Sequence, residues 1–290
     1  MIIRILLVLT CAALVLVSCQ KQLGWQIDPL TGKIAGDTLH NSLRSDDLLV
    51  SVVAITANEK ITTTYAYDPL RKLTSELREG TLKGEAVYQY KSFERDTLGR
   101  MMKISEWNRS PGLSVDTSYT FVYYDEPESK NYHYSVRHYK TAGTITRDST
   151  LYTYDGNGNL GLHRTFTMQG GTPLLNRSVE YTYAGENLVS QKVYADTSRT
   201  GSLAMVASYR FSYDHRVNPL TLSAEAILTG ALHCASKNNV IAVEISDAVH
   251  ATAGYALSNL ITYNWNDKPV SALQKLTPGT LETTYTYHYR

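Results

Sequence analysis

Alternating apolar and polar residues run along most of the chain from Leu48 onward, and this period of two predicts β-strands. Aromatic residues two positions apart recur within the pattern, as in Tyr65-Ala-Tyr67 and Tyr181-Thr-Tyr183. Because successive strand side chains point to opposite faces, the two tyrosines of each pair share one face of a sheet, and polar or small residues occupy the other. We expect the tyrosine face to line a wide, partly hydrated interior, since each hydroxyl needs water or a partner.

The tyrosine pairs recur at a nearly constant spacing. The anchor of each unit is the aromatic residue Tyr67, Tyr90, Tyr123, Tyr154, Tyr183, Tyr213, Trp265 or Tyr287. The four anchors from Tyr123 to Tyr213 are separated by 31, 29 and 30 residues, which is the length of one β-hairpin. Residues 48–290 are therefore predicted to form an all-β domain. It is a single antiparallel sheet of repeated hairpins, with roughly fourteen to sixteen strands, strongly curved or closed into a barrel.

One segment interrupts the alternation. Residues Thr221 to Ala235 are rich in alanine and show no period of two. This composition predicts at most one short helix, and an ordered loop that closes one end of the sheet is the alternative.

The first residues have the pattern of a processing signal. Ile5 to Val17 form an apolar run of thirteen residues, too short to span a bilayer comfortably. The following Leu16-Val-Ser-Cys19 resembles the lipobox of bacterial lipoproteins. That resemblance implies a signal peptide over residues 1–18, lipidation of Cys19 and a tether over residues 19–47. It also implies a membrane partner and a place in the bacterial cell envelope, with the outer membrane expected. An ordinary secretory signal is the alternative.

The amino-acid composition argues against a nucleic-acid partner and for a β-rich fold. Lys and Arg together number 28 against 27 for Asp and Glu, so no basic excess exists for phosphate neutralisation and we expect no nucleic-acid partner. Tyrosine is abundant, with 22 residues against 4 Phe and 3 Trp, which favours strands. Cys234 would be the sole free thiol after processing. In an Ala-Leu-His-Cys-Ala setting it is expected to be a small buried apolar residue with no catalytic role.

Two longer motifs carry a family resemblance. Tyr152 to Leu160 resembles the YD repeat of the RHS family, with a broken copy from Asp96 to Met101. The chain is also similar to a group of YD-like bacterial lipoproteins with a porin-like fold. The shared segments are Tyr213-Asp-His-Arg-Val-Asn-Pro219, Ser236-Lys-Asn-Asn-Val240 and a final Tyr-rich hairpin. This resemblance implies a fold and a compartment, and it implies no biochemical activity.

Residue patterns for catalysis or metal binding are weak. Asp155, Asn157 and Asn159 match the first ligand positions of a calcium loop, but Leu160 stands where that loop requires glycine. We therefore interpret the segment as a hairpin turn. The sequence contains no His-Glu-x-x-His, Gly-x-Ser-x-Gly, phosphate-loop or dinucleotide motif. We expect no enzyme, no cofactor and no metal site.

Two hypotheses for the function remain. In the first, the domain is a non-catalytic binding module for a glycan or another envelope ligand, and its ligand-facing residues are Tyr154, Tyr183, Tyr213 and Trp265. In the second, these aromatic residues are packed core, and the domain is a structural or assembly component that contacts a protein partner through sheet edges. A transmembrane pore fits less well, because the non-tyrosine faces carry Thr, Glu, Gln and Arg.

Overall fold

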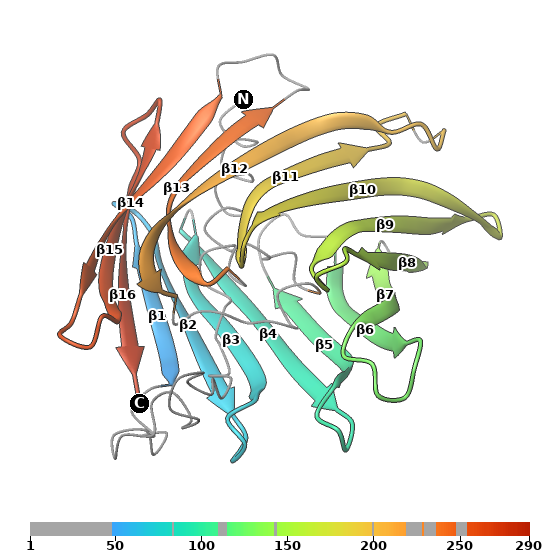
Figure 1. Ribbon diagram of the computed structural model, residues 1–290, viewed down its shortest axis with the longest axis horizontal. Helices are drawn as coiled ribbons and strands as arrows, with labels where there is room; N and C mark the ends of the chain where they lie inside the picture. Colours follow the sequence, from blue (N-terminus) through green and yellow to red (C-terminus); the bar gives the residue numbers. More distant parts are fainter. Residues whose placement is uncertain are drawn as a thin grey trace.

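Sixteen antiparallel strands form one closed barrel in the computed structural model (Figure 1). Residues 48–290 are described, with the exception of 83, 110–114, 142–143, 199, 219–227, 229–235 and 248–253. The strands are β1 (Leu49–Ile55), β2 (Lys60–Tyr67), β3 (Leu73–Leu82), β4 (Glu85–Arg95), β5 (Met101–Arg109), β6 (Val115–Tyr124), β7 (Tyr132–Thr141), β8 (Thr144–Tyr154), β9 (Leu160–Gln169), β10 (Thr172–Ala184), β11 (Asn187–Ala195), β12 (Ala204–Val217), β13 (Asn238–Asp247), β14 (Tyr255–Tyr263), β15 (Pro269–Thr277) and β16 (Glu282–Tyr289). The predicted all-β sheet of repeated hairpins is confirmed, and it closes.

Each strand pairs with the next one along the chain, and the pairing of β1 with β16 closes the ring. Val52 lies opposite Tyr287 at this seam. Beyond the two strands, the backbone N–H groups of Leu48 and Arg290 donate to each other's carbonyl oxygens, with N···O distances of 3.3 and 2.8 Å. The two ends of the described barrel are therefore hydrogen-bonded to one another.

Three sequence predictions fall on residues outside the described part of the chain. These are the signal peptide, the lipidated Cys19 with its tether, and the expected burial of Cys234. The segment predicted as a short helix or closing loop also lies outside the described residues, apart from Leu228. Leu228 packs against a cluster of buried side chains that includes Val52, Tyr65 and Phe93, although it belongs to the β12–β13 connection.

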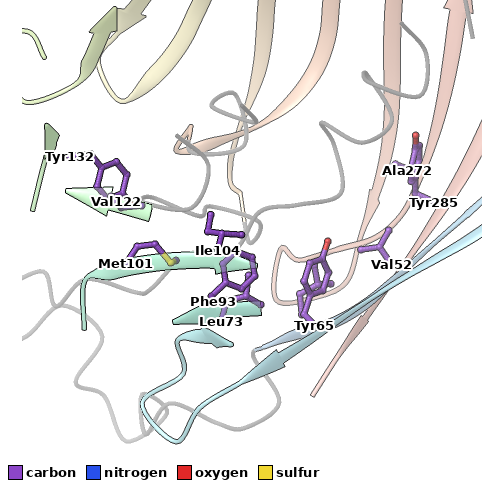
Figure 2. Close-up of a cluster of buried hydrophobic side chains, with 11 residues drawn as sticks. Val52, Tyr65, Leu73, Phe93, Met101, Ile104, Val122, Tyr132, Ala272 and Tyr285 are labelled. Atoms are coloured by element: carbon purple, nitrogen blue, oxygen red, sulfur yellow. The ribbon is translucent and has the colours of Figure 1, made fainter. Parts of the chain in front are cut away.

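Side chains alternate between the inside and the outside of the wall. In β2, Ile61, Thr63 and Tyr65 are buried while the residues between them are partly or fully exposed. Two apolar clusters cover the inner face. The first contains Leu49, Val52, Tyr65, Leu73, Phe93, Met101, Ile104, Val122, Tyr132, Ala272 and Tyr285 (Figure 2). The second contains Leu160, Val179, Tyr181, Leu188, Val193, Phe211, Val240, Val243, Ile245, Leu257 and Leu276. Each large side chain buried in this way stabilises the fold by about 1.5–3 kcal/mol.

Four hairpin turns share one hydrogen-bonding design. The side chain of the first turn residue accepts a hydrogen bond from the backbone N–H four positions later, at 2.8–3.0 Å, in the turns that begin at Asp68, Asp96, Asp155 and Asn264. The fourth residue of each turn has a positive φ, from 58° at Asp267 to 81° at Gly158. Glycine or a polar residue is favoured there because that conformation crowds a Cβ atom. The segment from Asp155 to Asn159 is thus the predicted hairpin turn.

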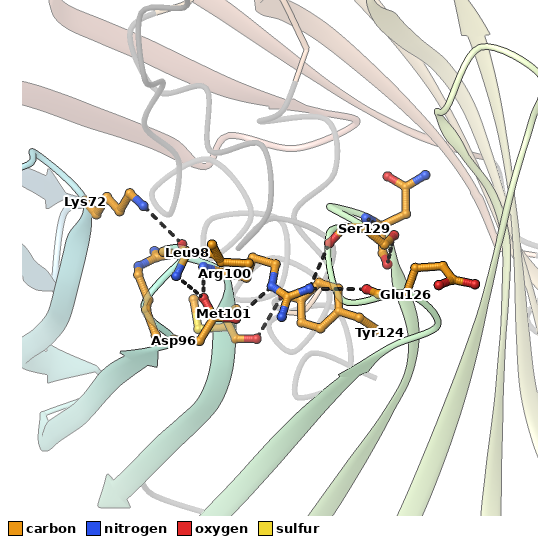
Figure 3. Close-up of polar contacts among 11 residues, drawn as sticks. Lys72, Asp96, Leu98, Arg100, Met101, Tyr124, Glu126 and Ser129 are labelled. Atoms are coloured by element: carbon orange, nitrogen blue, oxygen red, sulfur yellow. Dashed lines mark hydrogen bonds and ion pairs between the residues drawn. The ribbon is translucent and has the colours of Figure 1, made fainter.

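Neighbouring turns are also tied to one another (Figure 3). Lys72 Nζ donates to the carbonyl oxygen of Gly99 at 3.2 Å. Arg100 connects its turn to the next one, because its guanidinium donates to the carbonyl oxygens of Glu126 and Ser129 at 3.3 Å each. The same guanidinium lies 4.4 Å from the centre of the Tyr124 ring. The Gly-Arg pair in the broken YD copy therefore has a structural use.

Five tyrosines in the last residues of their strands bind the backbone of the preceding strand, and we call these residues the capping tyrosines. Each hydroxyl is hydrogen-bonded to a backbone group at the start of the preceding strand: Tyr67 to Leu49, Tyr124 to Met101, Tyr154 to Tyr132, Tyr213 to Leu188 and Tyr289 to Pro269. In β4, which ends without tyrosine, Arg95 makes the equivalent contact to the Leu73 carbonyl oxygen at 3.4 Å. Burial raises the pKa of Tyr124 to about 12, so this hydroxyl stays protonated and able to donate.

Candidate functional site

Polar side chains lie side by side on the inner face of β3–β7, in two hydrogen-bonded groups that the register brings together, and we call them the lumen network. Its members are Glu76, Gln89, Lys91, Glu106, Ser118 and Arg137. Their strands are held side by side by the barrel register, which places Glu76 opposite Lys91 and Lys91 opposite Glu106. Lys91 Nζ lies 3.5 Å from Glu76 Oε1, and Arg137 Nη2 lies 3.4 Å from Glu106 Oε2. Basic and acidic groups therefore alternate across the inner wall.

The charges of the network hold each other in the ionised state. Burial opposes the charged form of Lys91, but the carboxylates of Glu76 and Glu106 outweigh it and keep the pKa of the ammonium above its ordinary value. Burial likewise opposes ionisation of Glu106, and Lys91 and Arg137 together hold the pKa of its carboxyl below the ordinary value. Lys91 and Glu106 are thus held in their charged forms.

The polar surface continues across β8–β10 and becomes more open. Thr167 Oγ1 donates to Asp148 Oδ1 and accepts from Asn176 Nδ2, and Thr150 contacts Thr165 at 3.0 Å. The side chain of Glu76 is only 4% exposed, whereas that of Arg137 is 43% exposed. Hydroxyl, amide and charged groups therefore line one side of the lumen, from a buried part on β3 and β4 to an accessible part beyond β6. Such a wall is suited to hydrogen bonds with a hydroxyl-rich ligand.

Three buried polar atoms beside the network lack hydrogen-bond partners within the described structure. They are the Thr63 and Tyr65 hydroxyl oxygens and Glu76 Oε2, all on the inner face. Tyr65 lies directly opposite Glu76 in the β2–β3 register. A buried polar atom without a partner is costly, so these atoms mark a place where further hydrogen bonds would be gained.

The residues predicted to face a ligand occupy two different environments. Tyr154, Tyr183 and Tyr213 lie on the inner face of β8, β10 and β12, and all three pack against the second apolar cluster. Burial raises the pKa of each hydroxyl. Trp265 lies off the sheet, in the β14–β15 turn, and is 87% exposed. The structure therefore brings the three tyrosines to one end of the barrel, and Tyr154 and Tyr213 are capping tyrosines there.

The two segments that carry the lipoprotein resemblance meet at the same end of the barrel. Asn218 donates through its backbone N–H to the Lys237 carbonyl oxygen at 2.8 Å and through its side chain to the Ser236 carbonyl oxygen at 3.3 Å. Asn239 and Tyr263 both donate to the Asp214 carboxylate. These contacts fasten the two ends of the long β12–β13 connection, so we assign the motif a structural role.

Seven aromatic side chains lie on the outer face of β4–β7, and we call them the aromatic wall. They are Tyr88, Tyr90, Trp107, Tyr119, Phe121, Tyr123 and Tyr134. The sequence prediction of a polar or small outer face is therefore wrong for this part of the barrel. The tyrosine repeat predicts Tyr90 and Tyr123 on the inner face, but both lie on the outer face. The inward residues at the ends of these two strands are Arg95 and Tyr124. A doublet such as Tyr123-Tyr124 necessarily places one ring on each face.

The lumen network escaped prediction because its members are single polar residues that are far apart in the sequence. Glu106 and Arg137 are 31 positions apart. Each member lies an even number of positions from other inward residues of its strand, which indicates its face of the sheet. Its neighbours on the adjacent strands can be named only when the register is known. Among the described residues, no group of three or more His, Cys, Asp or Glu side chains could hold a metal ion. The same residues include no helix long and apolar enough to cross a bilayer.

Together these features define a closed sixteen-strand barrel whose inner wall is apolar in two clusters and polar along β3–β10. No protein-family model matches the chain, and no curated protein matches it. The solved structures that are similar include two crystal structures of porin-like proteins. A porin-like protein from Bacteroides uniformis ATCC 8492 aligns with a TM-score of 0.51 and 8% identity, over 83% of this chain and 96% of that one. A porin-like protein from Bacteroides vulgatus ATCC 8482 aligns with a TM-score of 0.52 and 11% identity, over 83% and 98%. At this identity the similarity concerns the fold alone.

Proposed function

We propose that this chain is a non-catalytic binding module of the bacterial cell envelope, and that it binds a hydroxyl-rich ligand, a glycan, on the inner wall of its barrel. The lumen network and its extension over β8–β10 are the observation that carries the proposal. Charged groups flanked by hydroxyl and amide groups recognise polyhydroxylated ligands through many oriented hydrogen bonds, and Lys91 and Glu106 are held in their charged forms. The fold of the two porin-like Bacteroides proteins supports a place in the envelope.

The structural alternative receives less support from the fold. Assembly through sheet edges requires a strand with unpaired backbone groups, and the pairing of β1 with β16 leaves the described barrel without such an edge. A scaffold that acts through its outer surface remains the second candidate.

The anchor is the second part of the proposal. Cys19 would hold the protein on a membrane through acyl chains after removal of residues 1–18. We expect Cys19→Ser to move the protein from the membrane fraction to the soluble fraction. Retention of that variant on membranes would contradict the anchor, and it would leave the binding proposal untouched.

Binding can be measured by titrating the full chain with a panel of bacterial envelope polysaccharides. Arg137→Gln and Asp148→Asn should weaken binding of the recognised polysaccharide about tenfold each while the melting temperature stays within a few degrees. Arg210→Gln, on the outer face of β12, is the matched control and should bind as the wild type does. If no polysaccharide binds, or if the control loses as much affinity as the lumen variants, the proposal is wrong.

Tyr154, Tyr183, Tyr213 and Trp265 remain predicted ligand contacts. The capping contacts of Tyr154 and Tyr213 support a structural use for these two residues. In the same titration, Trp265→Ala separates the possibilities most cleanly, because an exposed turn residue can be removed with little effect on folding.

A further inference from the structure

The outer surface of the barrel is divided into two chemically different parts. On β15, β16, β1 and β2, the outward residues of one row are Ser271, Thr286, Val53 and Thr62, and the next row adds Leu273, Thr284, Ile55 and Lys60. On β4–β9 the outward residues include the aromatic wall, Ile145, Leu151 and Met168. Ile145 is 75% exposed and Trp107 is 38% exposed. Single exposed apolar side chains occur elsewhere, such as Ile55 at 44% and Leu260 at 71%, but most of the exposed large apolar side chains of the strands lie on β4–β9.

This side also carries an excess of positive charge. Arg109, Lys140, Arg147 and Arg164 are exposed on the outer face of β5, β7, β8 and β9. The register places Arg109 opposite Tyr88, and Arg164 opposite Leu151, so the cations lie among the apolar residues. Among the described outward side chains of β4–β9, Glu94 is the single acid, and Lys103 Nζ neutralises it at 2.7 Å. The surface is thus both apolar and cationic.

The arrangement of the rings argues against a sugar as the occupant. Tyr123 and Tyr134 stack on each other with centroids 4.3 Å apart and planes 10° apart, and Tyr90 lies 5.5 Å from Trp107 at 36°. A sugar ring stacks on an open aromatic face, whereas one face of each ring in the Tyr123–Tyr134 pair is covered by the other ring. Tyrosine and tryptophan side chains fit the headgroup region of a membrane, where an apolar body and a polar tip are both accommodated.

We propose that the aromatic wall and its four cations form a docking surface for an anionic membrane. The guanidinium and ammonium groups contact lipid phosphates, and the exposed Ile145 and Leu151 side chains enter the boundary between headgroups and acyl chains. The contact is peripheral, because a spanning barrel requires an apolar band around its whole circumference. This surface lies on the opposite side of the wall from the lumen network, so the inference is independent of the proposed function.

Tryptophan fluorescence tests this orientation directly. The full chain is reconstituted with phosphatidylcholine vesicles that contain about 30 mol% phosphatidylglycerol and brominated acyl chains, because bromine quenches only nearby indoles. Trp25→Phe/Trp265→Phe leaves Trp107 as the reporter, and Trp25→Phe/Trp107→Phe leaves Trp265. We expect Trp107 to be quenched about twofold more strongly than Trp265, and only when phosphatidylglycerol is present.

Two charge variants complete the test in the Trp107 background. Arg109→Gln/Arg147→Gln/Arg164→Gln should reduce quenching of Trp107 to the level of Trp265. Lys60→Gln/Lys192→Gln/Arg210→Gln removes three outward cations from β2, β11 and β12 and should leave quenching unchanged. Equal quenching of both reporters, or stronger quenching of Trp265, would overturn the proposal. So would an unquenched Trp107 whose emission shifts on addition of an acidic polysaccharide, since that result identifies a glycan as the occupant.

Discussion

The hydroxyl of Tyr124 donates a hydrogen bond to the carbonyl oxygen of Met101 at 2.9 Å, from the end of β6 to the start of the preceding strand. The same relationship joins β2 to β1, where the Tyr67 hydroxyl donates to the Leu49 carbonyl oxygen at 2.8 Å. The tyrosine of the YD motif therefore has a geometric task. It satisfies a backbone carbonyl of β5 beyond the paired part of β5 and β6, which runs from Lys103–Phe121 to Trp107–Thr117.

Removal of the capping hydroxyl tests this role. Tyr124→Phe keeps the ring and leaves the Met101 carbonyl oxygen without its partner, so we expect a loss of about 1 kcal/mol in unfolding free energy. Tyr123→Phe is the matched control, because its ring lies on the outer face and stacks on Tyr134. Denaturant titration of both variants provides the comparison. Equal losses would show that the hydroxyl of Tyr124 has no special role.

The turn carboxylate should contribute more than one hydrogen bond. Asp96 accepts from the backbone N–H groups of Leu98 and Arg100 and from Arg100 Nε. We expect Asp96→Ala to lower the unfolding free energy by about 1–2 kcal/mol. Asp125→Ala removes an exposed carboxylate paired with His133 in a neighbouring turn and should cost much less. A smaller effect at Asp96 than at Asp125 would contradict this account of the turn.

The buried ion pair of the lumen should respond differently from an exposed one. Lys91→Met leaves the carboxylates of Glu76 and Glu106 without their shared cation, and we expect a loss of about 3–5 kcal/mol. Lys103→Met breaks the pair with Glu94 on the outer face, and its expected cost is about 0–1 kcal/mol. Thermal unfolding of the two variants at equal ionic strength measures the difference. Similar melting temperatures would mean that the network carries little electrostatic energy.

His163 predicts a pH dependence. Burial lowers the pKa of this inner-face imidazole from 6.5 to about 4, while the unfolded chain takes up the proton near the ordinary value. The unfolded state therefore binds more protons between these values, and stability is lost as pH falls from 6.5 towards 4. His163→Gln removes this contribution. The difference in unfolding free energy should move in favour of the variant by about 3 kcal/mol between neutral pH and pH 4. Parallel pH profiles would contradict the prediction.

The sequence allowed the barrel to be predicted more completely than its binding surfaces. The tyrosine spacing indicated hairpins because a period of about thirty residues accommodates two strands and their turns. The repeat predicts Trp265 on a strand, but β14 ends at Tyr263. Asn264 is the first residue of the turn, the position that Asp68, Asp96 and Asp155 occupy in the other three turns. Tyr263 is the aromatic residue at the end of this strand, and Trp265, two positions later, is exposed in the turn.

Register explains the remaining differences. Every bulge shifts the alternation by one position, and the sequence does not mark where a bulge falls. The irregularity between the Glu94–Lys103 and Arg95–Met101 pairs is one example, because it leaves Met102 without a partner on β4. The lumen network depends on the same information, because the pairing of Lys91 with Glu106 follows from the β4–β5 register.

The pairing of β1 with β16 also determines how the barrel can fail. All the other pairings join strands that are consecutive in the sequence, so most of the sheet can form locally. The β1–β16 pairing instead joins segments more than two hundred residues apart. A chain that ends before β16 would expose the full lengths of β1 and β15 as open hydrogen-bonding edges, and such edges recruit strands from other molecules. Truncation at this end should therefore produce aggregates rather than a smaller barrel.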